Sequence, residues 1–237
     1  MAIINSVIVS GGGSGPAGLY REFYLSANGE LLPNTTTTHI MDFTGMTDVM
    51  NYALTNAYWH NTAISGAVDM SDLTTLSGDR ACFAMFSGCT GITSEDLSGL
   101  TMISGGSACA YMFESCTGLT SANLPALTTV TSSYACQAMF SGCTGIISAD
   151  LSALTTVTSS YACSSMFSYC TSLATVYIGG TTAIDFGWRT NQFNYMFENC
   201  TQNIDVYAPA ANQAQIESFS GYPNFGGTGT VTWHWRS

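Results

Sequence analysis

The sequence predicts a repeat solenoid built mainly from short parallel β-strands, with one short helical turn in each 27-residue coil. A Met-Phe pair recurs at a constant interval, at 85–86, 112–113, 139–140 and 166–167, and returns at 196–197 after a slightly longer one. Cysteines and a strand-like Asp-Leu pattern repeat at the same interval. Self-similarity at roughly 20–50 residues is typical of solenoids, because each unit buries its apolar side only against its neighbours.

The nine cysteines form two columns at this period. The first column is Cys82, Cys109, Cys136 and Cys163, and the second is Cys89, Cys116, Cys143, Cys170 and Cys200. Stacked positions lie about 4.8 Å apart, which is close enough for a disulfide, but a column specifies no unique pairing. The histidines and CxxC pairs that would indicate zinc do not accompany them. We therefore expect a structural core ladder of reduced, buried thiols and no metal site.

One coil can be followed between the cysteines at 143 and 170. Its inward-facing apolar residues predict a strand and then a short second strand: Ile146, Ala149, Leu151, Leu154 and Val157. The segment 161–167 lacks glycine and proline, so we expect a helical turn that places Cys163, Met166 and Phe167 on one face. In the first coil, Thr55, Tyr58-Trp59 and Thr62 align with Cys82, Met85-Phe86 and Cys89.

The pattern divides the chain into three parts. Residues 42–208 form the solenoid. Residues 1–41 hold a strand, a glycine-rich linker at 11–15 and a cap, and we expect them to serve attachment or oligomerisation. Residues 209–237 form a C-terminal cap, with a helix within 208–219 and a last strand at 230–235. The two tryptophans of that strand either cover the last coil or offer a sugar-stacking platform.

Composition excludes several classes of partner. The formal charge is −11, with 15 acidic residues against four arginines and no lysine. Such a surface repels phosphate backbones and anionic membranes, so we expect neither nucleic acid nor membrane as partner. No apolar run is long enough for a transmembrane helix. Residues 1–10 lack the basic region of a signal peptide, so we expect no secretory leader.

An acidic column is the clearest candidate for a binding surface. Its members are Asp42, Asp69, Asp96, Asn123 and Asp150, and Tyr177 and Tyr207 continue it as degenerate members. Each residue precedes an inward apolar residue, so each should point outward. Two interpretations stay open: a solvated stripe that discourages aggregation, or a surface that binds Ca²⁺ or the hydroxyls of a glycan. We expect no other cofactor.

Catalytic residues are not indicated. The histidines at 39, 60 and 234 are far apart in the sequence, and each cysteine belongs to a repeated set. The paired carboxylates Glu95 and Asp96 should point to opposite faces of a strand. Tyr134 and Tyr161 fall in register on a ridge, where they either bind glycans or cover the core. We therefore expect a protein that is not an enzyme.

The segment from Cys116 to Val130 resembles the unit of BspA-like leucine-rich repeats. Cys116-Thr117-Gly118-Leu119 and Leu124-Pro125 match that family's CxxL and strand-end proline, whereas Met-Phe replaces its usual Ala-Phe. Residues 206–209, followed by a helix, resemble its closing cap. The likeness spans about residues 42–215 and implies a leucine-rich-repeat solenoid. The family implies a bacterial surface adhesion or interaction protein, and similar arrays occur in phage-associated proteins.

The resemblance favours a non-enzymatic recognition or adhesion module. We expect a phage virion or tail-associated protein, made in the host cytoplasm, that contacts a bacterial surface glycan or protein. The glycine-rich N-terminal segment is similar to phage structural proteins, and residues 1–41 would contact other virion proteins or a second copy. The alternatives are a bacterial cell-surface adhesin of the same fold and a structural decoration protein without a ligand.

Overall fold

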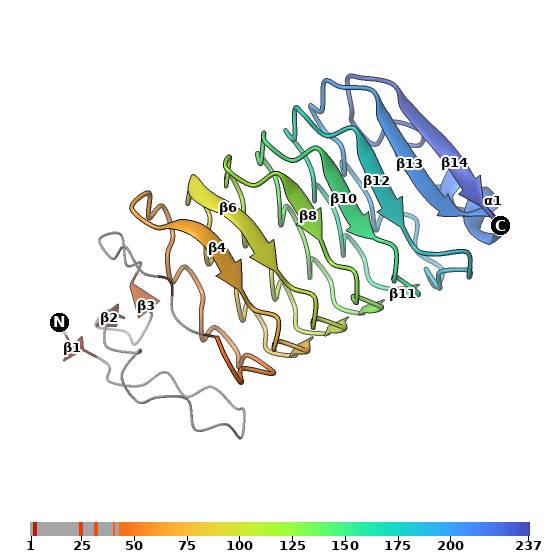
Figure 1. The fold of residues 1–237 in the computed structure, drawn as a ribbon. Helices are drawn as coiled ribbons and strands as arrows, with labels where there is room; N and C mark the ends of the chain where they lie inside the picture. Colours follow the sequence, from red (N-terminus) through yellow and green to blue (C-terminus); the bar gives the residue numbers. More distant parts are fainter. Residues whose placement is uncertain (1, 4–23, 26–30, 33–39, 41–42) are drawn as a thin grey trace.

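The computed structural model describes residues 2–3, 24–25, 31–32, 40 and 43–237. Residues 43–237 form a parallel β-solenoid of about six coils, stacked along one axis as Figure 1 shows. The predicted repeat solenoid is confirmed. Asp42, the linker at 11–15 and most of segment 1–41 lie outside the described residues, apart from a small antiparallel sheet of β1 (Ala2–Ile3), β2 (Tyr24–Leu25) and β3 (Leu31–Leu32).

Two sides of each coil are strands, and every strand pairs in parallel with its equivalent in the next coil. The first side contains β4 (Ser65–Asp69), β6 (Gly91–Asp96), β8 (Ser121–Asn123), β10 (Ser148–Leu151), β12 (Thr175–Ile178), β13 (Ile204–Pro209) and β14 (Val231–Arg236). The second side contains β5 (Thr75–Leu76), β7 (Met102–Ile103), β9 (Thr129–Val130) and β11 (Thr156–Val157). On the first side, β4 pairs with β6, and a separate five-stranded sheet runs in the order β14-β13-β12-β10-β8.

The third side is a ribbon of overlapping turns, where the sequence predicts a helical turn. The Met85 N–H donates to the Cys82 carbonyl three residues earlier (3.2 Å), whereas the Phe86 N–H donates to Met112 in the next coil (2.8 Å). This alternation repeats along the segment, and every fourth residue has a positive φ, as at Tyr161, Ser165 and Tyr169. The helical prediction is wrong because alternate amides bond between coils instead of within one. We call residues 78–88 and their equivalents the turn ribbon.

The first coil is offset by one residue from the alignment made on the sequence. The Tyr58 ring, not that of Trp59, stacks on Phe86, with centroids 5.2 Å apart and planes 4° apart. By the same register Leu54 and Asn61 stand beside Cys82 and Cys89, in place of Thr55 and Thr62. The cause lies downstream: β4 and β6 shift register between Gly66 and Ala67, where β6 carries an extra residue.

The core is built from identical side chains stacked coil upon coil. The rings of Phe86, Phe113, Phe140 and Phe167 stack nearly parallel, with successive centroids 5.3, 5.6 and 5.9 Å apart. All four are fully buried. Burial of one such side chain contributes about 1.5–3 kcal/mol, and each ring pair adds roughly 0.5–1.5 kcal/mol.

All nine cysteines are free and buried in this core. In the second column the thiol donates to the phenylalanine carbonyl of the preceding coil, as from Cys116 to Phe86 (3.1 Å) and from Cys143 to Phe113 (3.0 Å). In the first column the sulfurs of Cys109 and Cys136 lie 3.7 Å apart. Burial raises the pKa of Cys200 to about 11 and of Cys89 to about 12, so these thiols stay protonated at neutral pH.

The C-terminal residues close the end of the solenoid. A 3₁₀ turn (Ala210–Asn212) leads into α1 (Gln213–Glu217). Trp233 and Trp235 of β14 stack on each other 5.6 Å apart and pack, partly buried, against the core. The indole of Trp233 also donates to the Pro223 carbonyl at 3.0 Å. The two rings therefore cover the last coil.

Candidate functional site

One column of outward side chains follows the first strand side from coil to coil. Strand registers join Asp69 to Asp96, Asn123 to Asp150, and Asp150 through Tyr177 and Tyr207 to His234. We call this row the outer column: Asp69, Asp96, Asn123, Asp150, Tyr177, Tyr207 and His234. Its members are exposed or half-buried, whereas the residues that follow them in the strands, such as Leu97, Leu124 and Leu151, are buried. The column changes from carboxylates and an amide to rings between β10 and β12.

The aspartates of the outer column also shape the chain. Oδ1 of Asp69, Asp96 and Asp150 accepts the amide of the serine two residues later, at 3.0, 2.9 and 2.9 Å. Each aspartate thus fixes the turn that follows its strand. Sequence reasoning treated the column only as a solvated or binding stripe. The Asp-x-Ser spacing, repeated in three coils, was the signal for this turn.

Metal-ligand clusters are absent from the described residues: no three histidine, cysteine, aspartate or glutamate side chains are arranged to hold an ion. Successive members of the column stand about 4.8 Å apart, and their like charges repel. Asn123 separates Asp96 from Asp150 and relieves this repulsion at the centre.

The aromatic part of the column is a continuous stack. The ring centroids of Tyr177 and Tyr207 are 5.0 Å apart, and those of Tyr207 and His234 are 4.6 Å apart, with interplanar angles of 20° and 17°. His234 Nε2 lies 2.8 Å from Asp205 Oδ1. The Arg236 guanidinium lies 5.6 Å from the Tyr177 centroid and donates to the Gly179 carbonyl. Sequence reasoning placed both tyrosines in this column but missed their stacking and the place of His234.

Glu95 points into the core, opposite to Asp96, as the alternation of side chains predicts. It stands in the inward column of Val68 and Ala122 and is 8% exposed. Its Oε1 accepts the Asn123 amide at 2.9 Å, and its Oε2 is buried without a hydrogen-bond partner. Burial raises the pKa of Glu95 to about 7. The carboxyl therefore bridges the place where the sheet is interrupted between β6 and β8.

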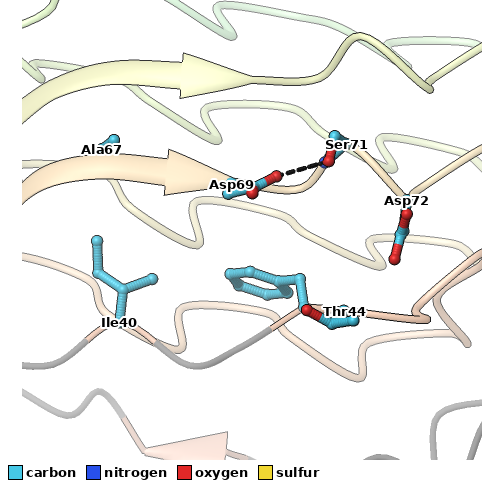
Figure 2. Close-up of a pocket in the computed structure, with 7 residues that line it drawn as sticks. Ile40, Thr44, Ala67, Asp69, Ser71 and Asp72 are labelled. Atoms are coloured by element: carbon cyan, nitrogen blue, oxygen red, sulfur yellow. Dashed lines mark hydrogen bonds between the residues drawn. The ribbon is translucent and has the colours of Figure 1, made fainter.

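A shallow hollow of about 180 Å³ lies at the N-terminal end of the solenoid. Figure 2 shows Ile40 and Ala67 on one side of it and Thr44, Ser71 and Asp72 on the other, with Asp69 bonded to Ser71. Its lining contains two carboxylates but neither histidine nor cysteine. It therefore does not bring together the groups that nucleophilic catalysis needs.

Comparisons with known proteins add little to this geometry. No family model matches the chain, and no curated protein matches it. Among solved structures, a leucine-rich repeat protein from Bacteroides ovatus matches with a TM-score of 0.25 and 12% sequence identity, over 83% of this chain and 87% of that one. The solenoid is established by the strand registers and the stacked core, without this likeness. No helix in the described part of the chain is long and apolar enough to span a membrane.

Proposed function

We propose that this protein is a non-enzymatic recognition or adhesion module of BspA-like leucine-rich-repeat type, which a phage virion or tail presents to the bacterial surface. The observation that carries the proposal is the outer column, a row of carboxylates and rings on a paired, rigid sheet. Because the strands already hold these side chains in place, a ligand pays little ordering entropy on binding.

The chemistry of the column suits a surface glycan. Carboxylates, hydroxyls and an amide accept and donate hydrogen bonds to sugar hydroxyls, and the net charge of −11 disfavours polyanionic partners. The nine free, buried thiols suit a protein assembled in a reducing cytoplasm. In this proposal residues 1–41 attach the solenoid to other virion proteins or to a second copy, so that deletion of residues 1–15 prevents incorporation into particles.

The test is binding of labelled protein to a panel of intact bacteria. Because the chain has no lysine, an amine-reactive dye at neutral pH labels the N-terminus alone. We expect saturable binding to particular strains, lost in the triple variant Asp69→Asn, Asp96→Asn, Asp150→Asn. Asparagine keeps the turn-forming acceptor and removes the charge.

A charge-matched triple variant on other faces controls for the loss of three charges: Asp79→Asn, Asp185→Asn and Glu217→Gln. It should bind as the parent protein does. Loss of binding in EDTA would add a cation to the interface. Absence of binding to every strain would refute recognition and leave a structural role in the particle, whereas export of the protein to the surface of a bacterial producer would identify an adhesin instead.

A further inference from the structure

The outer column contains a step in height between β10 and β12. Asp150 and Tyr177 are register partners on adjacent strands, which stand about 4.8 Å apart. A tyrosine ring reaches farther from the sheet than a carboxylate does, so the surface rises abruptly from Asp150 to Tyr177. On its other side, the Tyr177 ring is matched by Tyr207 and then His234 at nearly the same height.

The orientation of the stack decides which ring face a ligand meets. The planes of Tyr177 and Tyr207 are only 20° apart and their centroids are 5.0 Å apart, close to the strand spacing. The ring faces therefore point along the solenoid axis. One face of Tyr177 lies against Tyr207, and the opposite face points toward β10, above Asp150. Tyr177 is 37% exposed.

The floor below that face is made of short polar side chains. Ser121 and Asn123 of β8, Ser148 and Asp150 of β10, and Thr175 of β12 stand on the same outward side, joined by the strand registers. Oδ1 of Asp150 accepts the Ser152 amide, and a carboxylate has further acceptor capacity for a ligand hydroxyl. An apolar wall beside a floor of hydrogen-bonding groups fits an amphipathic, hydroxyl-rich ring.

We propose that this step binds one sugar ring of a neutral polysaccharide, which stacks its C–H face on Tyr177 while its hydroxyls bond to Asp150 and the neighbouring hydroxyl groups. The proposal rests on the proposed function and assigns it a subsite. A neutral sugar is favoured because Asp150 and Asp205 flank the ring within a chain of charge −11, and a uronic acid would be repelled. The cation nearest the stack, Arg236, is engaged with Gly179 and the Tyr177 ring.

The experiment measures binding of defined oligosaccharides by saturation-transfer NMR and calorimetry. The probes are the neutral hexamers of maltose, cellulose, mannan and chitin type, and hexagalacturonic acid as the acidic counterpart. We expect at least one neutral hexamer to bind, and Tyr177→Ala to weaken it about tenfold, which is the scale of one aromatic contact. Tyr177→Phe should keep the affinity within about threefold because the ring face is retained.

Tyr195→Ala is the matched control, since Tyr195 is 53% exposed but lies on the turn ribbon. Thermal melting verifies that each variant is folded. Tyr177→Leu, which keeps an apolar contact with Tyr207, replaces the alanine variant if that one unfolds. Binding of hexagalacturonic acid alone, equal binding by the Tyr177→Ala variant, or no binding of any neutral hexamer would each overturn the proposal.

Intact bacteria separate this proposal from the broader one. If Tyr177→Ala binds the recognised strains as well as the parent protein does, recognition stands and the subsite is refuted. If the parent protein binds no strain, the recognition function fails, whatever the oligosaccharides show.

Discussion

Neutralising Glu95 should remove a pH-dependent loss of stability. In the folded protein its carboxyl has a pKa of about 7, raised from 4.5 chiefly because burial disfavours the charged form. The folded state therefore holds this proton between pH 4.5 and 7, whereas the unfolded chain has released it. Stability is fully present below the unfolded pKa and is lost as pH rises through the folded one.

The size of the effect follows from the shift. A rise of about 2.5 units, at 1.36 kcal/mol per unit, gives about 3 kcal/mol once ionisation is complete. Integrated between pH 5 and pH 8, about 2 kcal/mol of this falls within an accessible range. The charged groups near Glu95 do not reverse the sign: Asp96 raises its pKa further, and the Asn123 amide lowers it by less than burial raises it.

The assay is urea unfolding of the parent protein and of Glu95→Gln at pH 5, 6, 7 and 8. Glutamine keeps an oxygen to accept the Asn123 amide and cannot ionise. Because other groups titrate in both proteins, the measured quantity is the difference in unfolding free energy at each pH. The variant should gain about 2 kcal/mol on the parent from pH 5 to pH 8, and an exposed control, Glu217→Gln, should gain nothing. A difference that is constant with pH would refute the reasoning.

Two further outcomes are expected. Because burial raises the thiol pKa values, a thiol-reactive chromogen should leave the native protein unmodified and titrate nine thiols in denaturant; rapid native modification would show that the core opens. Asp96→Ala removes the acceptor of the Ser98 amide and should cost about 1 kcal/mol in a thermal or urea melt, while Asp96→Asn should cost much less; equal losses would mean that charge, not the turn, matters.

The sequence predicts the parts of the fold that depend on period alone. The constant repeat interval places Met112-Phe113 above Met85-Phe86 whatever the local backbone does, so the core stack follows directly. The local backbone does not follow, because YACSSMF suits a helical turn as well as a run of turns. The positive φ at Tyr161 and Ser165, residue types that seldom adopt it, is imposed by bonding to the next coil.

The offset of the first coil shows a second limit. The alignment of Thr55 with Cys82 assumed a constant period, and one extra residue in β6 breaks it. Nothing in the composition of β6 marks that bulge. Similarly, the outer column was predicted as a row of outward residues, but a step at Tyr177 depends on the packing of rings from three strands, which a one-dimensional pattern does not contain.

The turn ribbon has a mechanical consequence. Its alternate amides, such as those of Cys82 and Phe86, bond to the next coil, and the strands on the other two sides do the same. Tension applied along the axis therefore loads all three sides of an interface at once, and many backbone bonds must break together. A pull on the free end of the chain instead peels the bonds one after another. A solenoid of this kind should resist stretching between its two ends far better than unravelling from a terminus.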